Sequence, residues 1–330
     1  QIKRNKCEVL PERVLIIDQL NLFFRSYIVN PSLSKNGDPI GGLMGSIKSL
    51  QKVIRETSPD KVVICWDGPG GSKKRKLVHK EYKAGRKPLR LNRDIRHLSE
   101  DEEMKNKIWQ QTRLIEYFEQ MPVIQLMYPD IEADDIIAYV ARMPSYKGKQ
   151  KIILSSDKDF FQLLDNETIL NRPIQKEILN KNMILEKFGI HPTNFTLARA
   201  MVGDRSDNLE GVGGIGLATV TKRFPFLSEE KTYSLEDIIS FSKKRFEETN
   251  MKAYSNLLDK KDIFYRNYKM MQLYSPSLSI GVKKSIKEIC CSETNSFSKT
   301  EIRKMMIQDG FGDYDWSSLF QNFNRMTLKK

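Results

Sequence analysis

The sequence has few of the residues that build zinc sites and disulfide frameworks. Its 330 residues include four cysteines and three histidines, and the cysteines show no CxxC spacing. The histidines, His79, His97 and His191, lie outside every acidic motif. Zinc sites and disulfide scaffolds depend on such clusters, so we expect neither, and we expect the cysteines to be reduced thiols. A Ser-His catalytic triad is equally unsupported.

Long hydrophobic runs are also missing. The longest, residues 14–17 and 62–66, are far shorter than the roughly 20 residues that cross a bilayer. Residues 1–7 are basic, but no apolar segment follows them, so they lack the pattern of a secretory signal. We therefore expect no membrane span and a location in the cytoplasm.

What the sequence has is an excess of positive charge in a globular composition. It carries 55 Lys and Arg against 42 Asp and Glu, a net charge of +13, with 39% hydrophobic residues. That hydrophobic fraction suffices for a sizeable core and argues against disorder. Residues 73–96 alone contain eleven basic and two acidic side chains. Such a block is either a solvated loop or a surface that binds a polyanion, and its composition alone does not decide between them.

The pattern of apolar residues predicts an α/β fold followed by a helical region. Residues 13–17 and 61–66 are continuous apolar runs, typical of strands buried on both faces, and a helical pattern at 43–54 completes a βαβ unit with parallel strands. Further elements are expected in the order helix 103–120, strand 122–127, helix 132–142, strand 151–154, and helices 195–202, 215–224 and 235–248. A polar tail at 292–300 and a last short helix complete the pattern. We predict an α/β domain in residues 1–190 and an all-α domain in residues 191–330.

Acidic residues follow several of the expected strands, including Asp18, Asp67 and Asp157. The carboxyl ends of parallel strands meet at one edge of a sheet, where the full set would be Asp18, Asp67, Glu132, Asp134, Asp135, Asp157 and Asp159. Two unit charges ~4 Å apart repel by ~4 kcal/mol at an effective dielectric constant of about 20, so this set requires compensating cations. Oxygen ligands without His or Cys favour Mg²⁺ or Mn²⁺ over Zn²⁺. Taken singly, the acids at 132–135 also suit a helix N-terminus, and Asp18 suits a turn.

A third acidic group leads into a glycine-rich segment. Asp204 and Asp207 lie in residues 203–208, and four glycines follow: Gly211, Gly213, Gly214 and Gly216. Their spacing matches GxGxxG, but no hydrophobic strand precedes them, which argues against a dinucleotide-binding fingerprint. A helix-hairpin-helix over about 195–225 fits better, because such glycines let backbone N–H groups approach a phosphate without reading base sequence. A plain helix–helix turn is the alternative.

In order and spacing, these segments resemble the 5′-nuclease, or flap endonuclease, superfamily, and most of all its stand-alone bacteriophage 5′→3′ exonucleases. The matching segments, within about 13–225, are 17–25, 66–67, 82–86, 132–135, 155–159 and 202–216. The resemblance implies a PIN-like α/β core, a helical arch at about 70–105, and a helix-hairpin-helix that binds duplex DNA and a K⁺ ion. It also implies that two divalent ions, Mg²⁺ or Mn²⁺, are held by nine carboxylates, namely the seven above together with Asp204 and Asp207.

The same resemblance also assigns DNA-contact roles to the basic residues. It implies that the scissile phosphate and the 5′ strand are contacted by Lys83, Arg86 and Arg25. Further DNA contacts would come from the outer charges Lys73, Lys74, Arg75 and Lys76, which add affinity by displacing counterions. The duplex-binding hairpin would be lined by Gly211, Gly213, Gly214 and Gly216.

We therefore expect a metal-dependent, structure-specific 5′→3′ exonuclease or flap endonuclease that hydrolyses phosphodiester bonds near 5′ ends in primer removal, DNA replication or repair. Two cations can activate water, so no protein nucleophile is required. The substrate would be DNA with a 5′ flap or 5′ end, or an RNA/DNA hybrid, which would add RNase H activity. We expect a monomer that works with replication proteins, in the host-cell cytoplasm if a phage encodes it. A non-catalytic DNA-binding scaffold is the alternative, but a scaffold has no need of mutually repelling carboxylates.

Overall fold

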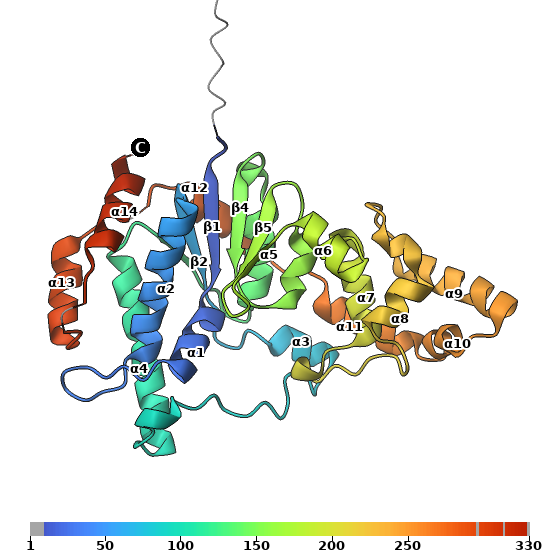
Figure 1. The fold of residues 1–330 in the computed structure, drawn as a ribbon, viewed down its shortest axis with the longest axis horizontal. Coiled ribbons are helices and arrows are strands. Elements are labelled where there is room, and N and C mark those ends of the chain that lie inside the picture. The colour runs from blue at the N-terminus through green and yellow to red at the C-terminus, as the bar shows by residue number, and fades with distance from the viewer. Residues whose placement is uncertain (1–9, 295–296, 313, 329–330) are drawn as a thin grey trace, which may run out of the picture.

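The computed structural model describes residues 10–294, 297–312 and 314–328, and it is built on a six-stranded sheet (Figure 1). Five strands are parallel, and the sixth runs antiparallel to its neighbour at one edge. Their order across the sheet is β3 (Ile124–Leu126), β2 (Lys61–Cys65), β1 (Arg13–Asp18), β4 (Gln150–Leu154), β5 (Thr168–Arg172) and β6 (Glu177–Leu179). The predicted parallel core is confirmed, and the β5–β6 hairpin is an addition that the sequence pattern did not indicate.

Both faces of the sheet are covered by helices. Along β1, Val14 and Ile16 point to one face, while Leu15 and Ile17 point to the other. All four are at most 1% exposed, which explains why the strand has no polar alternation. The first face packs against α5 (Ala133–Arg142). The second packs against α1 (Gln19–Val29), α2 (Gly41–Thr57) and α4 (Glu100–Glu119).

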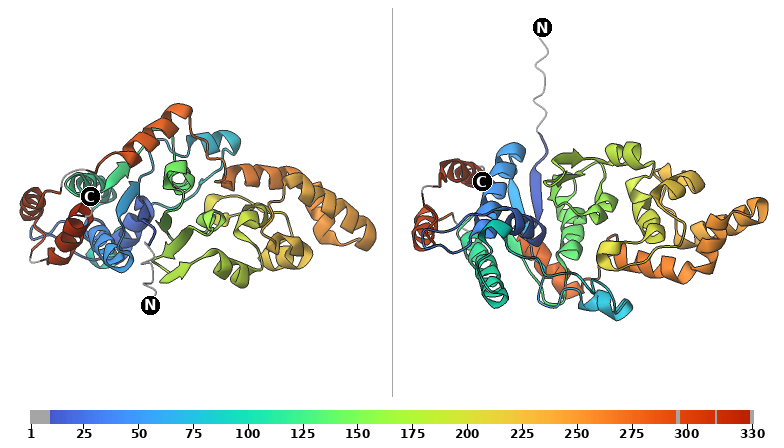
Figure 2. Two further views of the ribbon diagram at one scale, coloured as in Figure 1. Left: turned by 90° about the horizontal axis from the view of Figure 1, so that it is seen from above. Right: turned by 60° about the horizontal axis from the view of Figure 1, so that its bottom comes forward.

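The remaining helices extend the molecule in two directions (Figures 1 and 2). A helical region leads away from the sheet and ends at α9 and α10, whereas α13 and α14 lie at the opposite end, beside α2 and α4. The bounds are α3 (Lys73–Val78), α6 (Lys181–Phe188), α7 (Phe195–Val202), α8 (Leu217–Arg223), α9 (Leu235–Thr249), α10 (Lys252–Asp259), α11 (Lys261–Met271), α12 (Ile280–Cys291), α13 (Lys299–Gln308) and α14 (Ser317–Leu328). The three helices expected after residue 190 are α7, α8 and α9.

The C-terminal helices α13 and α14 pack on the sheet core. Ile302 and Phe323 belong to the same buried cluster as the inner residues of α2 and α4. Asp309, just after α13, accepts hydrogen bonds from Arg113 Nε and Tyr117 Oη of α4, each at 2.7 Å. The described residues 292–294 and 297–298 are irregular, as expected, but two helices, α13 and α14, follow where one short helix was expected. The domain boundary at residue 190 stays a prediction, although α13 and α14 contact its N-terminal side.

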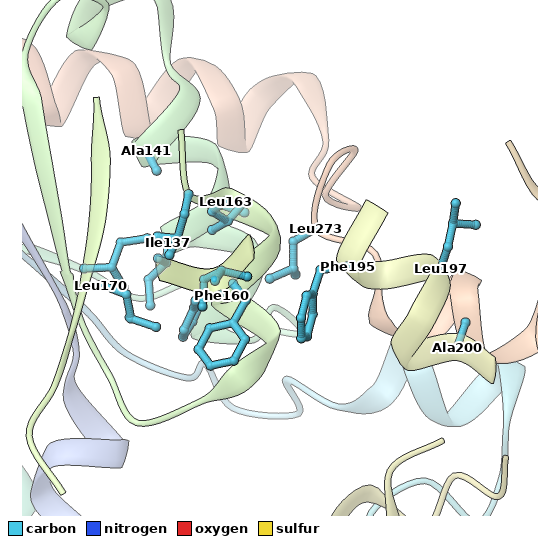
Figure 3. Close-up of a cluster of buried hydrophobic side chains, with 14 of the residues drawn as sticks. Ile137, Ala141, Phe160, Leu163, Leu170, Phe195, Leu197, Ala200 and Leu273 are labelled. Atoms are coloured by element: carbon cyan, nitrogen blue, oxygen red, sulfur yellow. The ribbon is translucent and has the colours of Figure 1, made fainter. Parts of the chain in front are cut away.

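A buried cluster fixes the elements that carry several acidic residues (Figure 3). It brings together Ile137 of α5, Leu170 of β5, Phe195 of α7 and Phe160 of the 3-10 helix η3 (Lys158–Leu163). All four side chains are at most 2% exposed. The helix η3 begins directly after Asp157, so close packing of this cluster holds the acidic segment in place.

No helix in the described part of the chain is both long and apolar enough to cross a membrane. The thiols of Cys65, Cys290 and Cys291 are free, with the first two buried. The fourth cysteine, Cys7, lies outside the described residues.

Candidate active site

Three acidic residues come together at the carboxyl edge of the sheet. Asp18 ends β1, Asp67 follows β2 and Asp157 follows β4, and these strands are neighbours in the order β2-β1-β4. Burial, and after it the charges of Asp67 and Asp157, raise the pKa of Asp18 to about 7. The convergence expected from parallel strand ends is thus present.

Local hydrogen bonds hold each of these carboxylates in position. Asp18 accepts from the hydroxyl of Ser155, the residue directly after β4, at 2.8 Å. Asp67 accepts from the backbone N–H of Ala133 at 2.6 Å, which joins the end of β2 to the first residue of α5. Asp157 accepts from the backbone N–H of Asp159 at 2.8 Å. The site is therefore fixed by contacts between elements and within single turns.

The acids at the start of α5 divide into two groups. Burial, followed by the charges of Asp157 and Asp18, raises the pKa of Asp134 well above its ordinary value, so Asp134 belongs with the carboxylates of the sheet edge. Glu132 and Asp135 instead face basic side chains from the segment that follows β2. A favourable interaction with the helix dipole alone does not account for this division.

The basic segment is bound to these acids. Arg75 of α3 donates to Glu132 Oε2 at 2.5 Å and to both oxygens of Asp135 at 2.9 and 3.2 Å. Lys83 Nζ donates to Glu132 Oε1 at 2.8 Å. Although burial favours the neutral acid, the charges of Arg75 and Lys83 lower the pKa of Glu132. Figure 1 shows this segment running below the carboxyl ends of the strands.

The four outer charges of the segment differ in their surroundings. Lys73 pairs with Asp130 at 3.6 Å, and Lys74 donates to the carbonyl of Ser277 at 2.8 Å. Arg75 is only 14% exposed, whereas Lys76 is exposed. DNA contact by the four residues stays a prediction, but it is least favoured for Arg75, because its guanidinium is already bonded to Glu132 and Asp135. In the segment expected to form a helical arch, α-helix is found in α3 and again from the start of α4.

The segment's second half contacts the third acidic group. Arg86 pairs with Asp207 and donates from Nε to the carbonyl of Ser206 at 2.9 Å. The backbone N–H of Lys83 donates to the carbonyl of Asp207 at 3.0 Å. Lys83 has a left-handed backbone with φ of +57°, a strained conformation that tends to occur at functional sites. These contacts bring Lys83 and Arg86 to the carboxylates, whereas their contact with a phosphate stays a prediction.

Sequence reasoning missed Arg199, a residue of α7. Its Nη2 donates to Asp159 Oδ1 at 2.9 Å and to Asp204 Oδ2 at 2.6 Å. Although burial favours the neutral acid, hydrogen bonds from Ser206 and the charge of Arg199 keep the pKa of Asp204 below its ordinary value. A basic residue one helical turn before the Gly203-Asp204 turn was the available signal.

Arg25 was expected, with Lys83 and Arg86, to contact the scissile phosphate and the 5′ strand. It lines a groove of about 470 Å³ between α1, α2 and the β5–β6 hairpin, together with Lys48, Lys52 and Lys176. Among the described residues, no contact joins Arg25 to Lys83 or Arg86. Its role toward the 5′ strand stays a prediction.

The glycine hairpin connects α7 to α8 and contains glycines of two kinds. A Cβ at Gly211 would come within 2.0 Å of the Val202 carbonyl oxygen, so this glycine is required by packing. Gly214 has a φ of +77°, which favours glycine for conformational reasons. Gly213 and Gly216 are exposed: a Cβ at Gly216 would meet open space, and one at Gly213 would meet Lys260 Nζ at 3.9 Å. Two helices, α7 and α8, are thus joined by the glycine segment, with accessible backbone at Gly213 and Gly216, and its role as a duplex-binding helix-hairpin-helix stays a prediction.

The donor chemistry of the sheet edge fits a hard divalent cation. Burial and mutual repulsion raise the pKa values of three carboxyl groups above their ordinary value, namely those of Asp18, Asp134 and Asp157. In the described part of the chain, no ion pair compensates these three or Asp67, whereas Glu132, Asp135, Asp159, Asp204 and Asp207 each contact Lys or Arg. Within the same residues, no three acidic side chains already enclose a metal position. The residues best suited to hold an ion are therefore Asp18, Asp67, Asp134 and Asp157.

Comparison with solved structures agrees with this fold. The chain matches the bacteriophage T5 flap endonuclease, solved in a complex with DNA and metal ions, with a TM-score of 0.64 at 18% identity, covering 85% of this chain and 100% of that one. The junction-resolving enzyme GEN-1 matches with a TM-score of 0.51 at 15% identity, over 92% of this chain and 67% of that one. These similarities establish a PIN-like nuclease fold.

Sequence comparison identifies the family. The 5′-3′ exonuclease of Buchnera aphidicola is 34% identical over 212 residues, which is 62% of this chain and 67% of that protein. The 5′-3′ exonuclease of Aquifex aeolicus is 28% identical over 265 residues, 79% of this chain and 81% of that protein. A family model described as the 5′-3′ exonuclease N-terminal resolvase-like domain matches residues 13–189. The chain therefore belongs to the 5′-3′ exonuclease family of phosphodiester hydrolases.

Proposed function

We propose that this family member is a metal-dependent nuclease that cuts phosphodiester bonds near the 5′ end of a branched or nicked DNA, including 5′ flaps. The observation that carries the proposal is the cluster of Asp18, Asp67, Asp134 and Asp157 at the sheet edge, without an ion-pair partner in the described residues. Lys83 and Arg86 lie against the acids that flank it. A carboxylate cluster next to cations suits the binding of a metal ion and a phosphate.

In the proposed reaction, two Mg²⁺ or Mn²⁺ ions are held by these four carboxylates, with the other acids acting through water or ion pairs. When bound, such ions activate a water molecule and stabilise the charge that develops on the phosphoryl oxygens. Lys83 and Arg86 bind the phosphate at the reacting position. To do so, Lys83 leaves Glu132 and Arg86 leaves Asp207, so the phosphate replaces a carboxylate that each cation contacts in the free protein.

The proposed substrate combines a duplex with a 5′ single strand. The exposed backbone at Gly213 and Gly216 suits contact with duplex phosphates, and a K⁺ ion at this hairpin would add to it. The exposed positive charge of the basic segment suits the single strand. We propose that the protein acts as a monomer in the cytoplasm with replication proteins, on DNA and on RNA/DNA hybrids, in primer removal.

A non-catalytic scaffold of the same fold is the competing function. Cleavage of a 5′-labelled flap with a double-stranded stem distinguishes the two. In Mg²⁺ we expect short labelled products that map to the flap junction, and in EDTA we expect none. Intact flap in Mg²⁺, with DNA bound, would favour the scaffold.

A further inference from the structure

Arg199 joins the helix-hairpin-helix to the sheet core through two carboxylates. Its Nη2 lies 2.9 Å from Asp159 Oδ1 and 2.6 Å from Asp204 Oδ2. Asp159 belongs to η3, which follows β4, whereas Asp204 begins the turn that leads to the glycine hairpin. A single nitrogen atom thus bridges the segment that carries the acids of the sheet edge and the segment expected to grip the duplex.

The bridge is largely shielded from water. The side chains of Arg199, Asp159 and Asp204 are 13%, 15% and 17% exposed, so salt screens their attraction less than it screens a surface pair. The Nε of Arg199 is buried and has no hydrogen-bond partner in the described residues. A buried unpaired donor is unfavourable, so the fold keeps this arginine in place for the contacts that its Nη2 makes.

Backbone hydrogen bonds also connect Arg199 to the turn at Asp204. The Gly203 N–H donates to the Arg199 carbonyl at 2.8 Å, and Asp204 and Leu209 exchange two backbone hydrogen bonds of 2.8 Å. Gly203 has a φ of +79°, and a Cβ there would come within 2.4 Å of Gly211 N. The turn is therefore tied to Arg199 by backbone as well as side-chain hydrogen bonds.

We infer that Arg199 is a positioning residue that couples the glycine hairpin to the carboxylates of the sheet edge. It fixes Asp159 and Asp204 relative to each other, so that a duplex on the hairpin delivers its 5′ strand to the carboxylates at a set distance. It also supplies a permanent positive charge to the acids on the hairpin side of the site. The inference rests on the proposed nuclease function, and it extends that function to a residue outside the nine carboxylates and the basic segment.

The test compares Arg199→Met with Arg199→Lys and with a control, Arg245→Met, which removes a surface arginine of α9 paired with Glu248. Three quantities are measured: hydrogen exchange of the amides of residues 203–209 without DNA, duplex affinity in EDTA, and single-turnover cleavage in Mg²⁺. For Arg199→Met we expect at least tenfold faster exchange and at least tenfold slower cleavage of a flap with a duplex stem. We expect duplex affinity within twofold of the wild type and less than threefold slower cleavage of a short single strand.

The lysine variant should stay within threefold of the wild type in each assay, because one ammonium group can replace the single bridging nitrogen, and Arg245→Met should match the wild type. Unchanged exchange and cleavage in Arg199→Met would overturn the inference, as would equal loss on both substrates with normal exchange. If the methionine variant does not fold, Arg199→Gln takes its place with the same expected results. A wild type that cleaves nothing in Mg²⁺ would refute the proposed nuclease function, whereas the exchange measurement would still test the bridge.

Discussion

Replacing Arg75 with Met should destabilise the protein while leaving its DNA contacts intact. The guanidinium of Arg75 is 14% exposed and bonds to Glu132 and Asp135, whose side chains are 4% and 11% exposed. Its Nε also donates to the Met270 carbonyl at 3.1 Å, so it joins α3, α5 and α11. Removing one partner from a buried ion pair costs about 3–5 kcal/mol, because the remaining charge is left uncompensated. Lys83 still contacts Glu132, so we expect the lower end, about 3 kcal/mol.

Thermal unfolding in EDTA measures this loss. An unfolding entropy of about 2.1 cal/mol/K per residue gives ~0.7 kcal/mol/K for this chain, so ~3 kcal/mol lowers Tm by about 4 °C. The matched control is Lys76→Met, which removes an exposed charge from the same helix and should leave Tm unchanged.

In DNA binding, we expect Lys76→Met to have the larger effect and Arg75→Met the smaller one. If Lys76 is a phosphate contact, Lys76→Met flattens the slope of log affinity against log salt by ~0.9, whereas Arg75→Met leaves the slope unchanged. An Arg75→Met protein with normal Tm and a flattened salt slope would refute the reasoning, since Arg75 would then be a DNA contact and not an anchor.

Three further predictions concern the site. Lys83→Ala and Arg86→Ala should each slow single-turnover cleavage at least tenfold with DNA affinity changed less than threefold, because these cations act on the reacting phosphate; an affinity loss as large as the rate loss would contradict this. Gly213→Val should weaken binding to duplex DNA while cleavage of a short single strand continues at the normal rate, because the side chain blocks backbone approach; equal loss on both would indicate misfolding. In EDTA, Tm should fall as pH rises from about 4 to 7, because the pKa of Asp18 is raised from 3.8 to about 7 in the folded protein and its protonated form stabilises the fold. Asp18→Asn should flatten that profile, and an unchanged profile would count against a buried, repelling carboxylate.

The strands that carry the site were predictable because their signals are local. Residues 14–17, 62–66 and 152–154 are apolar without interruption, and an acid follows each run within three residues, so parallel pairing alone brings Asp18, Asp67 and Asp157 together. β5 escaped prediction because three of its five residues are polar. Thr168, Asn171 and Arg172 are each at most 8% exposed, so burial there does not follow apolar composition.

Partners far apart in sequence could not be predicted. Arg75 lies 60 residues from Asp135, and Arg199 lies 40 residues from Asp159, and nothing in local spacing links either pair. Both basic residues would otherwise count as solvent-exposed or DNA-facing charges. The ion pairs that divide the acidic residues into two groups therefore follow from the tertiary fold alone.

The central claim is tested most directly by Asp134→Asn, an almost isosteric change that removes one negative charge from the sheet edge. Its control is Asp130→Asn, which changes an acid in the turn before α5 that pairs with Lys73. We measure single-turnover cleavage of a 5′-labelled flap in Mg²⁺, and flap affinity in EDTA. The account predicts that Asp134→Asn binds the flap like the wild type and gives no labelled product, while Asp130→Asn cleaves normally. Cleavage by Asp134→Asn at the wild-type rate would contradict it.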